Sequence, residues 1–149
     1  MASGPALDTR SGRTDDAGME SRHVSRVMRA SPAAVYEYAA DIGNLPQWAA
    51  GLAQAEVVRD GDRLLVDSPM GRVEVRFVER NHFGVLDHDV TLPSGTMVTN
   101  PVRVLAHPYG AEVIFTIRQI GLDDDEFARD ADVVAADLER LEHRVLEQG

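Results

Sequence analysis

The chain has 149 residues and no cysteine, and it carries a formal net charge of −10 from 15 basic and 25 acidic residues. This length fits one domain with one hydrophobic core, and the absence of cysteine excludes disulfides, thiolate nucleophiles and cysteine-ligated metal centres. The negative charge repels phosphate backbones, so nucleic acid is not an expected partner. Because no apolar run is long enough to span a membrane and no secretory signal is present, we expect a cytoplasmic protein.

The N-terminal third contains a polar tail and three short elements. Residues 1–18 are rich in Gly, Ser, Asp and Thr without periodicity, which predicts a disordered tail before a single domain over 19–149. A short strand is expected from His23 to Arg29. Ser31 followed by Pro32 then predicts the N-cap and N1 position of a short helix, Ala33–Ala40. A second short helix is expected from Leu45 to about Gly51.

Six more strands are predicted between Ala55 and Arg118, because apolar residues alternate there between turn signals. The predicted turns are Asp60-Gly61, Met70-Gly71, Asn81-His82, Pro93-Ser94-Gly95 and Pro108-Tyr109. All of these turns leave apolar residues on one face of an antiparallel meander and charged residues on the other. On the charged face, Asp87 and Arg103 are expected to form an exposed ion pair.

The hairpin over Val85–Val104 raises the functional question. A three-residue loop ending in Gly95 pairs His88 with Asn100, because Gly accepts the left-handed backbone that this loop needs. A two-residue loop would mix apolar and charged residues on each face, so the pattern favours the longer loop. His88 and Asn100 are therefore predicted to face each other within hydrogen-bonding distance, on an otherwise apolar surface.

A long C-terminal helix is predicted to cover that apolar surface. Asp123 and Glu126 form a capping box at its start. Apolar residues then recur at spacings of three and four in one stripe: Phe127, Ala131, Val134, Leu138, Leu141 and Val145. About 24 residues give a helix of roughly 36 Å, long enough to cross the sheet. Residues 123–149 hold ten acids and three arginines, which indicates a solvated acidic face or, as an alternative, a docking surface.

The order of these elements, and two segments, resemble the START/Bet v1-like superfamily, which includes the polyketide cyclase/dehydrase-like (SRPBCC) proteins. The segments are Ala30-Ser31-Pro32-Ala33-Ala34-Val35-Tyr36 and Asp41-Ile42-Gly43-Asn44-Leu45-Pro46-Gln47-Trp48, and the last helix is also similar. The resemblance covers about residues 20–147. It implies an α+β helix-grip fold, in which a curved antiparallel sheet of about seven strands wraps a long C-terminal helix. In this superfamily the space between sheet and helix holds lipids, sterols, polyketides or plant hormones.

We therefore predict that a small hydrophobic molecule binds between the sheet and the C-terminal helix without catalysis, cofactor or metal. Small apolar side chains on the concave face leave room for it, and Trp48 can stack on a ring or, alternatively, plug the junction between sheet and helix. The predicted ligand-binding residues are Trp48, Ser68, Val75, Phe77, Leu86, His88, Asn100, Val102, Phe115 and Leu138.

Other interpretations of His88 remain open. His88 and Asn100 could serve only to satisfy each other, because a buried polar group without a partner costs about 1–3 kcal/mol. Alternatively, the protein is a polyketide cyclase, aromatase or dehydratase with His88 as general base. No acid shares the face of His88, since Asp87 and Asp89 point away, so a catalytic triad is not supported. A metal site is not expected either, because no carboxylate converges with the histidines.

Overall fold

The computed structural model describes residues 20–49, 56–68 and 71–148, except for the side chain of Ser68. The predicted tail, Gly51 and Ala55 lie outside these residues. The strands are β1 (Ser21–Met28), β2 (Glu56–Asp60), β3 (Arg63–Ser68), β4 (Gly71–Phe77), β5 (His88–Thr91), β6 (Met97–Asn100), β7 (Val102–His107) and β8 (Gly110–Arg118). The helices are α1 (Pro32–Ala40), the 3-10 turn η3 (Ile42–Asn44), α2 (Leu45–Trp48) and α4 (Asp124–Gln148).

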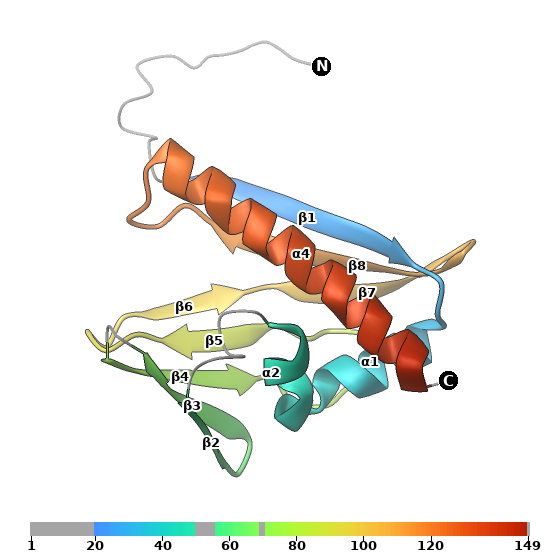
Figure 1. Ribbon diagram of the computed structural model, residues 1–149, viewed down its shortest axis with the longest axis horizontal. Helices are drawn as coiled ribbons and strands as arrows, with labels where there is room; N and C mark the ends of the chain where they lie inside the picture. The colour runs from blue at the N-terminus through green and yellow to red at the C-terminus, as the bar shows by residue number, and fades with distance from the viewer. Residues whose placement is uncertain (1–19, 50–55, 69–70, 149) are drawn as a thin grey trace.

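The strands form an antiparallel meander in two parts, a three-stranded sheet β1-β8-β7 and a five-stranded sheet β2-β3-β4-β5-β6 (Figure 1). The division falls at Pro101, which splits one predicted strand into β6 and β7, so eight strands form instead of about seven. Proline has no N–H to donate to the ladder, so pairing is interrupted there. Backbone hydrogen bonds continue across the break, from Leu86 N to Val102 O and from Thr116 N to Pro101 O, each 2.8 Å long.

The predicted register of the central hairpin is confirmed: His88 pairs with Asn100 and Val90 pairs with Val98. The other turns before it are displaced. Val57 pairs with Val66, where the predicted turn placed Leu64. The turns between β3 and β4 and between β4 and β5 are shifted by two residues as well. Because side chains alternate with a period of two, a shift of two leaves every residue on its predicted face.

The C-terminal helix α4 forms as predicted. Asp123 Oδ1 accepts from Glu126 N at 2.8 Å, and Asp123 N donates to Glu126 Oε1 at 2.9 Å. All six residues of the predicted apolar stripe are buried. The helix lies along β1 and β8 (Figure 1). A buried carboxylate fixes this packing, since Glu142 accepts from Arg26 Nε at 2.8 Å and from Arg29 N at 3.0 Å.

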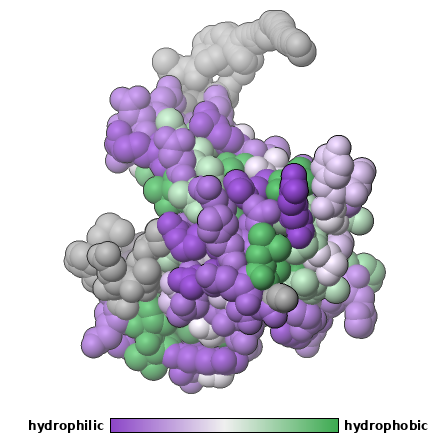
Figure 2. All heavy atoms as spheres, turned by 45° about the vertical axis from the view of Figure 1, so that its right-hand side comes forward, coloured by the Kyte–Doolittle hydropathy of each residue, from purple (hydrophilic) through white to green (hydrophobic). Residues whose placement is uncertain are grey.

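The short helices join α4 to the rest of the molecule. Ser31 caps α1 by accepting from Ala34 N at 3.1 Å, and Pro32 opens the helix, as predicted. Both α1 and α2 contact α4. Figure 2 shows hydrophilic side chains over most of one face, with hydrophobic side chains gathered in separate patches. No helix within the described ranges is long and apolar enough to cross a lipid bilayer.

Candidate functional site

A buried polar side chain, His88, lies at the start of β5 on the inner face of the five-stranded sheet and is 7% exposed. Its cross-strand neighbours are Phe77 and Asn100. The predicted Asn81-His82 turn would pair Val75 with His88. In the structure Phe77 is the residue that pairs with His88. The rings of Phe77 and Phe115 meet the imidazole edge to face, with centroids at 5.4 and 5.5 Å. His88 is thus a polar group set between two phenyl rings.

The predicted hydrogen bond between His88 and Asn100 is not formed. Instead, His88 Nδ1 lies 3.4 Å from the carbonyl oxygen of Leu86. Since a carbonyl only accepts, this contact favours the tautomer with the proton on Nδ1 and leaves the Nε2 lone pair free. Within the described residues, Nε2 has no hydrogen-bond partner. Burial lowers the pKa of His88, and the Leu86 carbonyl and the charges of Asp87 and Asp89 oppose this effect, so the imidazole is neutral at pH 7.

The inner face around His88 is only partly covered. Apolar side chains on this face of β2, β4, β5 and β6 remain half-buried: Val57, Val73, Phe77, Val90 and Val98. Leu64, Val66 and Val75 on the same face are at most 5% exposed, and Met28, Val113 and Ile117 on the inner face of the three-stranded sheet are at most 3% exposed. The helix α4 packs on β1 and β8 of that sheet. An apolar surface with incomplete cover therefore lies on the five-stranded side.

Trp48, whose indole also carries a polar N–H, ends the short helix α2. Its side chain is 3% exposed and belongs to the same core cluster as Leu86 and Phe115. Its Nε1 atom is buried and has no hydrogen-bond partner among the residues that the structure describes. The helix α4 fixes its backbone, because Arg140 Nη1 donates to Trp48 O at 2.9 Å and Arg144 Nε donates to Gln47 O at 3.3 Å.

The other predicted site residues occupy several positions in the fold. Leu86, Val75, Val102 and Phe115 are buried on the inner face, and Leu138 is buried in the stripe of α4. Asn100 is half-buried opposite His88. Ser68 ends β3 opposite Gly71, and its side chain lies outside the description. Their role as ligand contacts stays a prediction.

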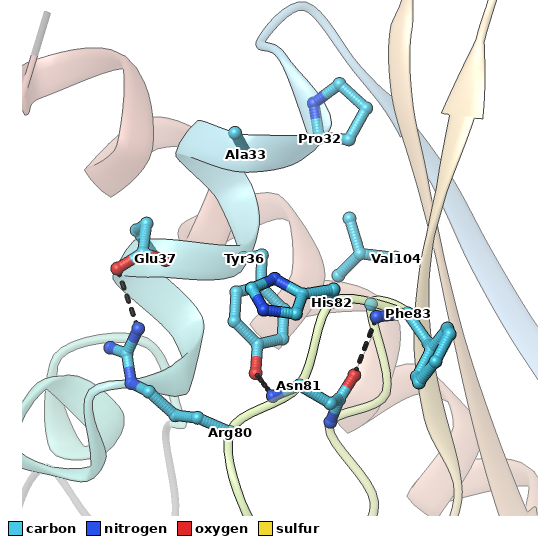
Figure 3. A pocket seen from close by; sticks show the side chains of 10 residues that line it. Pro32, Ala33, Tyr36, Glu37, Arg80, Asn81, His82, Phe83 and Val104 are labelled. Atoms are coloured by element: carbon cyan, nitrogen blue, oxygen red, sulfur yellow. Dashed lines mark hydrogen bonds and ion pairs between the residues drawn. The ribbon is translucent and has the colours of Figure 1, made fainter.

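A surface pocket that the sequence analysis missed lies between α1 and the loop that joins β4 to β5 (Figure 3). Its volume is about 510 Å³. Its lining residues are Pro32, Ala33, Tyr36, Glu37, Arg80, Asn81, His82, Phe83, Gly84 and Val104. In Figure 3, Arg80 Nη1 donates to Glu37 Oε1 at 2.7 Å, and the Tyr36 hydroxyl accepts a hydrogen bond from the backbone N–H of Asn81. The Arg80 guanidinium also lies over the Tyr36 ring, 5.9 Å from its centroid.

Asn81 organises the loop beside this pocket. Its Oδ1 accepts from Phe83 N at 3.0 Å and from Val85 N at 3.1 Å, while its Nδ2 donates to Glu79 O and Val85 O. Gly84 has a φ of 72°, and a Cβ there would lie 2.3 Å from Val104 O. The predicted two-residue turn is therefore wrong, and an Asn-centred loop replaces it. The sequence signal for this loop is an Asn whose side chain can accept a hydrogen bond from the backbone N–H two residues later, followed by a Gly.

We compared the chain with protein-family models, curated proteins and solved structures. A family model described as "Polyketide cyclase / dehydrase and lipid transport" matches residues 19–145. No curated protein matches the chain. Among solved structures, XoxI from Bacillus cereus aligns with a TM-score of 0.66 at 14% identity, covering 87% of this chain and 98% of its own. TTHA0849 from Thermus thermophilus gives 0.57 at 20% identity, with coverages of 87% and 99%.

A third structure, Ara h 8.0201, aligns with a TM-score of 0.62 at 11% identity and covers 87% of this chain and 99% of its own. At these identities the structural matches show the fold alone, an antiparallel sheet with a long C-terminal helix in a helix-grip arrangement. The family match spans nearly the whole described chain, and the curved antiparallel sheet with its long C-terminal helix agrees with it. This chain belongs to the polyketide cyclase / dehydrase and lipid transport family.

Proposed function

We propose that the protein binds a small hydrophobic molecule between the inner face of the five-stranded sheet and the helices α2 and α4. One observation carries the proposal: a half-buried apolar surface surrounds the buried, neutral His88. Apolar surface left without cover in a single chain is typical of a ligand-binding site. Family membership supports the proposal, because the family description includes lipid transport.

The test is a titration with N-phenyl-1-naphthylamine, a neutral hydrophobic fluorophore. We expect saturable fluorescence enhancement with the unmodified protein. Val90→Phe fills the inner face and should weaken binding at least about tenfold. Thr91→Phe adds the same ring on the opposite face of β5, because adjacent strand residues point to opposite sides, and it should leave binding unchanged. Thermal unfolding of both variants checks that they fold.

Two results would contradict this proposal. The first is a fluorophore that fails to bind the unmodified protein at micromolar concentrations. The second is equal binding by Val90→Phe and Thr91→Phe, which would place the site elsewhere. The pocket beside Asn81 is then the next candidate, and Phe83→Ala would test it with the same fluorophore.

General base catalysis by His88 is a second candidate function. It is favoured by the neutral imidazole and the free Nε2 lone pair. The Leu86 carbonyl, instead of a carboxylate, orients the ring. If a polyketide-like substrate is turned over, His88→Gln should lower kcat by about 10²–10⁴-fold, the usual contribution of a general base. A variant that keeps its rate would exclude this mechanism.

A further inference from the structure

The Trp48 Nε1–H and His88 Nε2 form no hydrogen bond with a described residue, and they differ in kind. The indole Nε1–H of Trp48 is a donor only, and within ranges 20–49, 56–68 and 71–148 it is buried without a partner. The Nε2 atom of His88 is an acceptor in the tautomer that the Leu86 carbonyl favours. A buried donor without a partner loses its bond to water and gains nothing in return, so it is rare in folded proteins. Trp48 therefore requires an explanation that packing alone does not supply.

The two arginines of α4 that donate to the backbone of α2, Arg140 and Arg144, are each already paired with a carboxylate. Arg144 is paired with Glu147 at 3.4 Å. Arg140 is paired with Asp137 at 3.0 Å and also donates to the carbonyl of Trp48. His88 is neutral. A carboxylate entering this interior would lose its hydration without meeting a countercharge, which is costly, and the net charge of −10 repels anions before entry.

From these observations we infer that the interior ligand is a neutral molecule with an acceptor oxygen, such as a ketone, ester or hydroxyl, which accepts a hydrogen bond from the Trp48 indole N–H. As ligands of this site, both free carboxylates and plain hydrocarbons should bind more weakly, each for a different reason. The hydrocarbon leaves the N–H unpaired, and the carboxylate is buried without a cation. This inference rests on the proposed function, because it concerns the ligand of the same interior site.

The test compares three probes of nearly equal shape: 2-acetylnaphthalene, 2-ethylnaphthalene and the 2-naphthoate anion. Affinities are measured by calorimetry with the full chain at pH 7.5. We expect the ketone to bind about tenfold more tightly than the hydrocarbon and than the anion. Since Trp48 is the only tryptophan of the chain, one indole ¹H–¹⁵N resonance reports the contact. That resonance should move downfield with the ketone relative to the hydrocarbon complex, as hydrogen bonding to an N–H does.

The single tryptophan also allows a change that preserves shape. Replacing it biosynthetically with β-(3-benzothienyl)alanine removes the N–H and keeps the bicyclic ring. In that protein the ketone and the hydrocarbon should bind equally, with hydrocarbon affinity unchanged. Trp48→Phe gives the same comparison by ordinary mutagenesis, and thermal unfolding confirms that each protein folds.

The outcomes separate the two proposals. If none of the three probes binds, the proposed function fails. If the hydrocarbon binds as tightly as the ketone, or the benzothienyl protein keeps the preference for the ketone, binding stands and the role of Trp48 is refuted. If the naphthoate binds most tightly, a cation serves the site and the requirement for a neutral ligand is wrong.

Discussion

The two sheets differ in how completely their inner faces are covered. The three-stranded sheet packs against α4, and residues such as Val113 and Ala111 are at most 1% exposed. On the five-stranded sheet, Val90 and Val98 remain half-buried although they lie on the same inner face. One amphipathic helix has a single apolar stripe, so it cannot cover both sheets equally. The core contains the first sheet, α4 and the buried residues Leu64, Val66 and Val75 of the second sheet, and the half-buried remainder of the second sheet is where we propose that a ligand binds.

The largest effect is expected from breaking the covered side. Leu138→Ala removes a side chain that is 1% exposed on α4 and should lower the free energy of unfolding by about 3 kcal/mol, since loss of burial adds to a cavity. Leu146→Ala on the same helix is the matched control, because Leu146 is 48% exposed. It should change stability by less than about 0.5 kcal/mol. Urea titration measures both, and similar losses would show that α4 is not held by its stripe.

The same substitution in each sheet tests the contrast directly. Val113→Ala on β8 should cost about 2 kcal/mol, because two fully buried methyl groups are lost. Val98→Ala on β6 should cost less than about 1 kcal/mol, because this side chain is only half-buried. With a bound hydrophobic ligand, the penalty at Val98 should grow while that at Val113 stays constant. Equal penalties in the free protein would remove the distinction between the two sheets.

His88 should make stability depend on pH on the five-stranded side. Burial lowers its pKa in the folded protein, so the unfolded chain binds more protons as pH falls below about 6.5. The contribution of His88 is fully present above that pH and is lost on acidification toward the lowered folded pKa. The slope cannot exceed about 1.4 kcal/mol per pH unit for one proton. Urea unfolding at pH 7 and pH 5 should show a smaller loss in His88→Gln than in the unmodified protein; an equal loss would contradict the assignment.

The smallest effect is expected at Phe83, in the loop between two strands of the five-stranded sheet. Its ring is 83% exposed, while the hydrogen bonds that hold the loop belong to Asn81. Phe83→Ala should therefore change the free energy of unfolding by no more than about 0.5 kcal/mol. Asn81→Ala, which removes those bonds, should cost about 1–2 kcal/mol. Thermal unfolding compares the two, and a large loss in Phe83→Ala would show that the ring packs within the fold.

Several parts of this molecule could be predicted from local chemistry. The capping box at Asp123, the stripe of α4 and the N-cap at Ser31 each depend on residues within a few positions of one another. The register of His88 with Asn100 also followed from the three-residue loop that closes its hairpin. The exposed ion pair of Arg103 with Asp87, at 2.8 Å, was predicted from the same register. In each of these features the interacting residues lie within one helix, one cap or one hairpin, so they are close in the sequence.

The predictions that were wrong involve either residues far apart in the sequence or a local hydrogen bond that competes with the expected one. The turn beside Asn81 was missed because its side chain builds a loop that no strand pattern shows. The bond between His88 and Asn100 was expected from their pairing, but the imidazole turns to Leu86 and packs between two phenyl rings. Phe115 comes from the other sheet, so only the folded chain brings it to His88.

The sequence by itself determined the order of elements, the face on which the residues of the strands after β1 lie, and the family. Alternation with a period of two and a stripe with a period near 3.6 are properties of the covalent chain, and they survived turns shifted by two residues. Only the tertiary structure decided which sheet α4 covers, that Pro101 divides the strands, and that the Trp48 N–H is buried without a partner. Those outcomes depend on how the elements share a limited apolar surface in space, which no local pattern specifies.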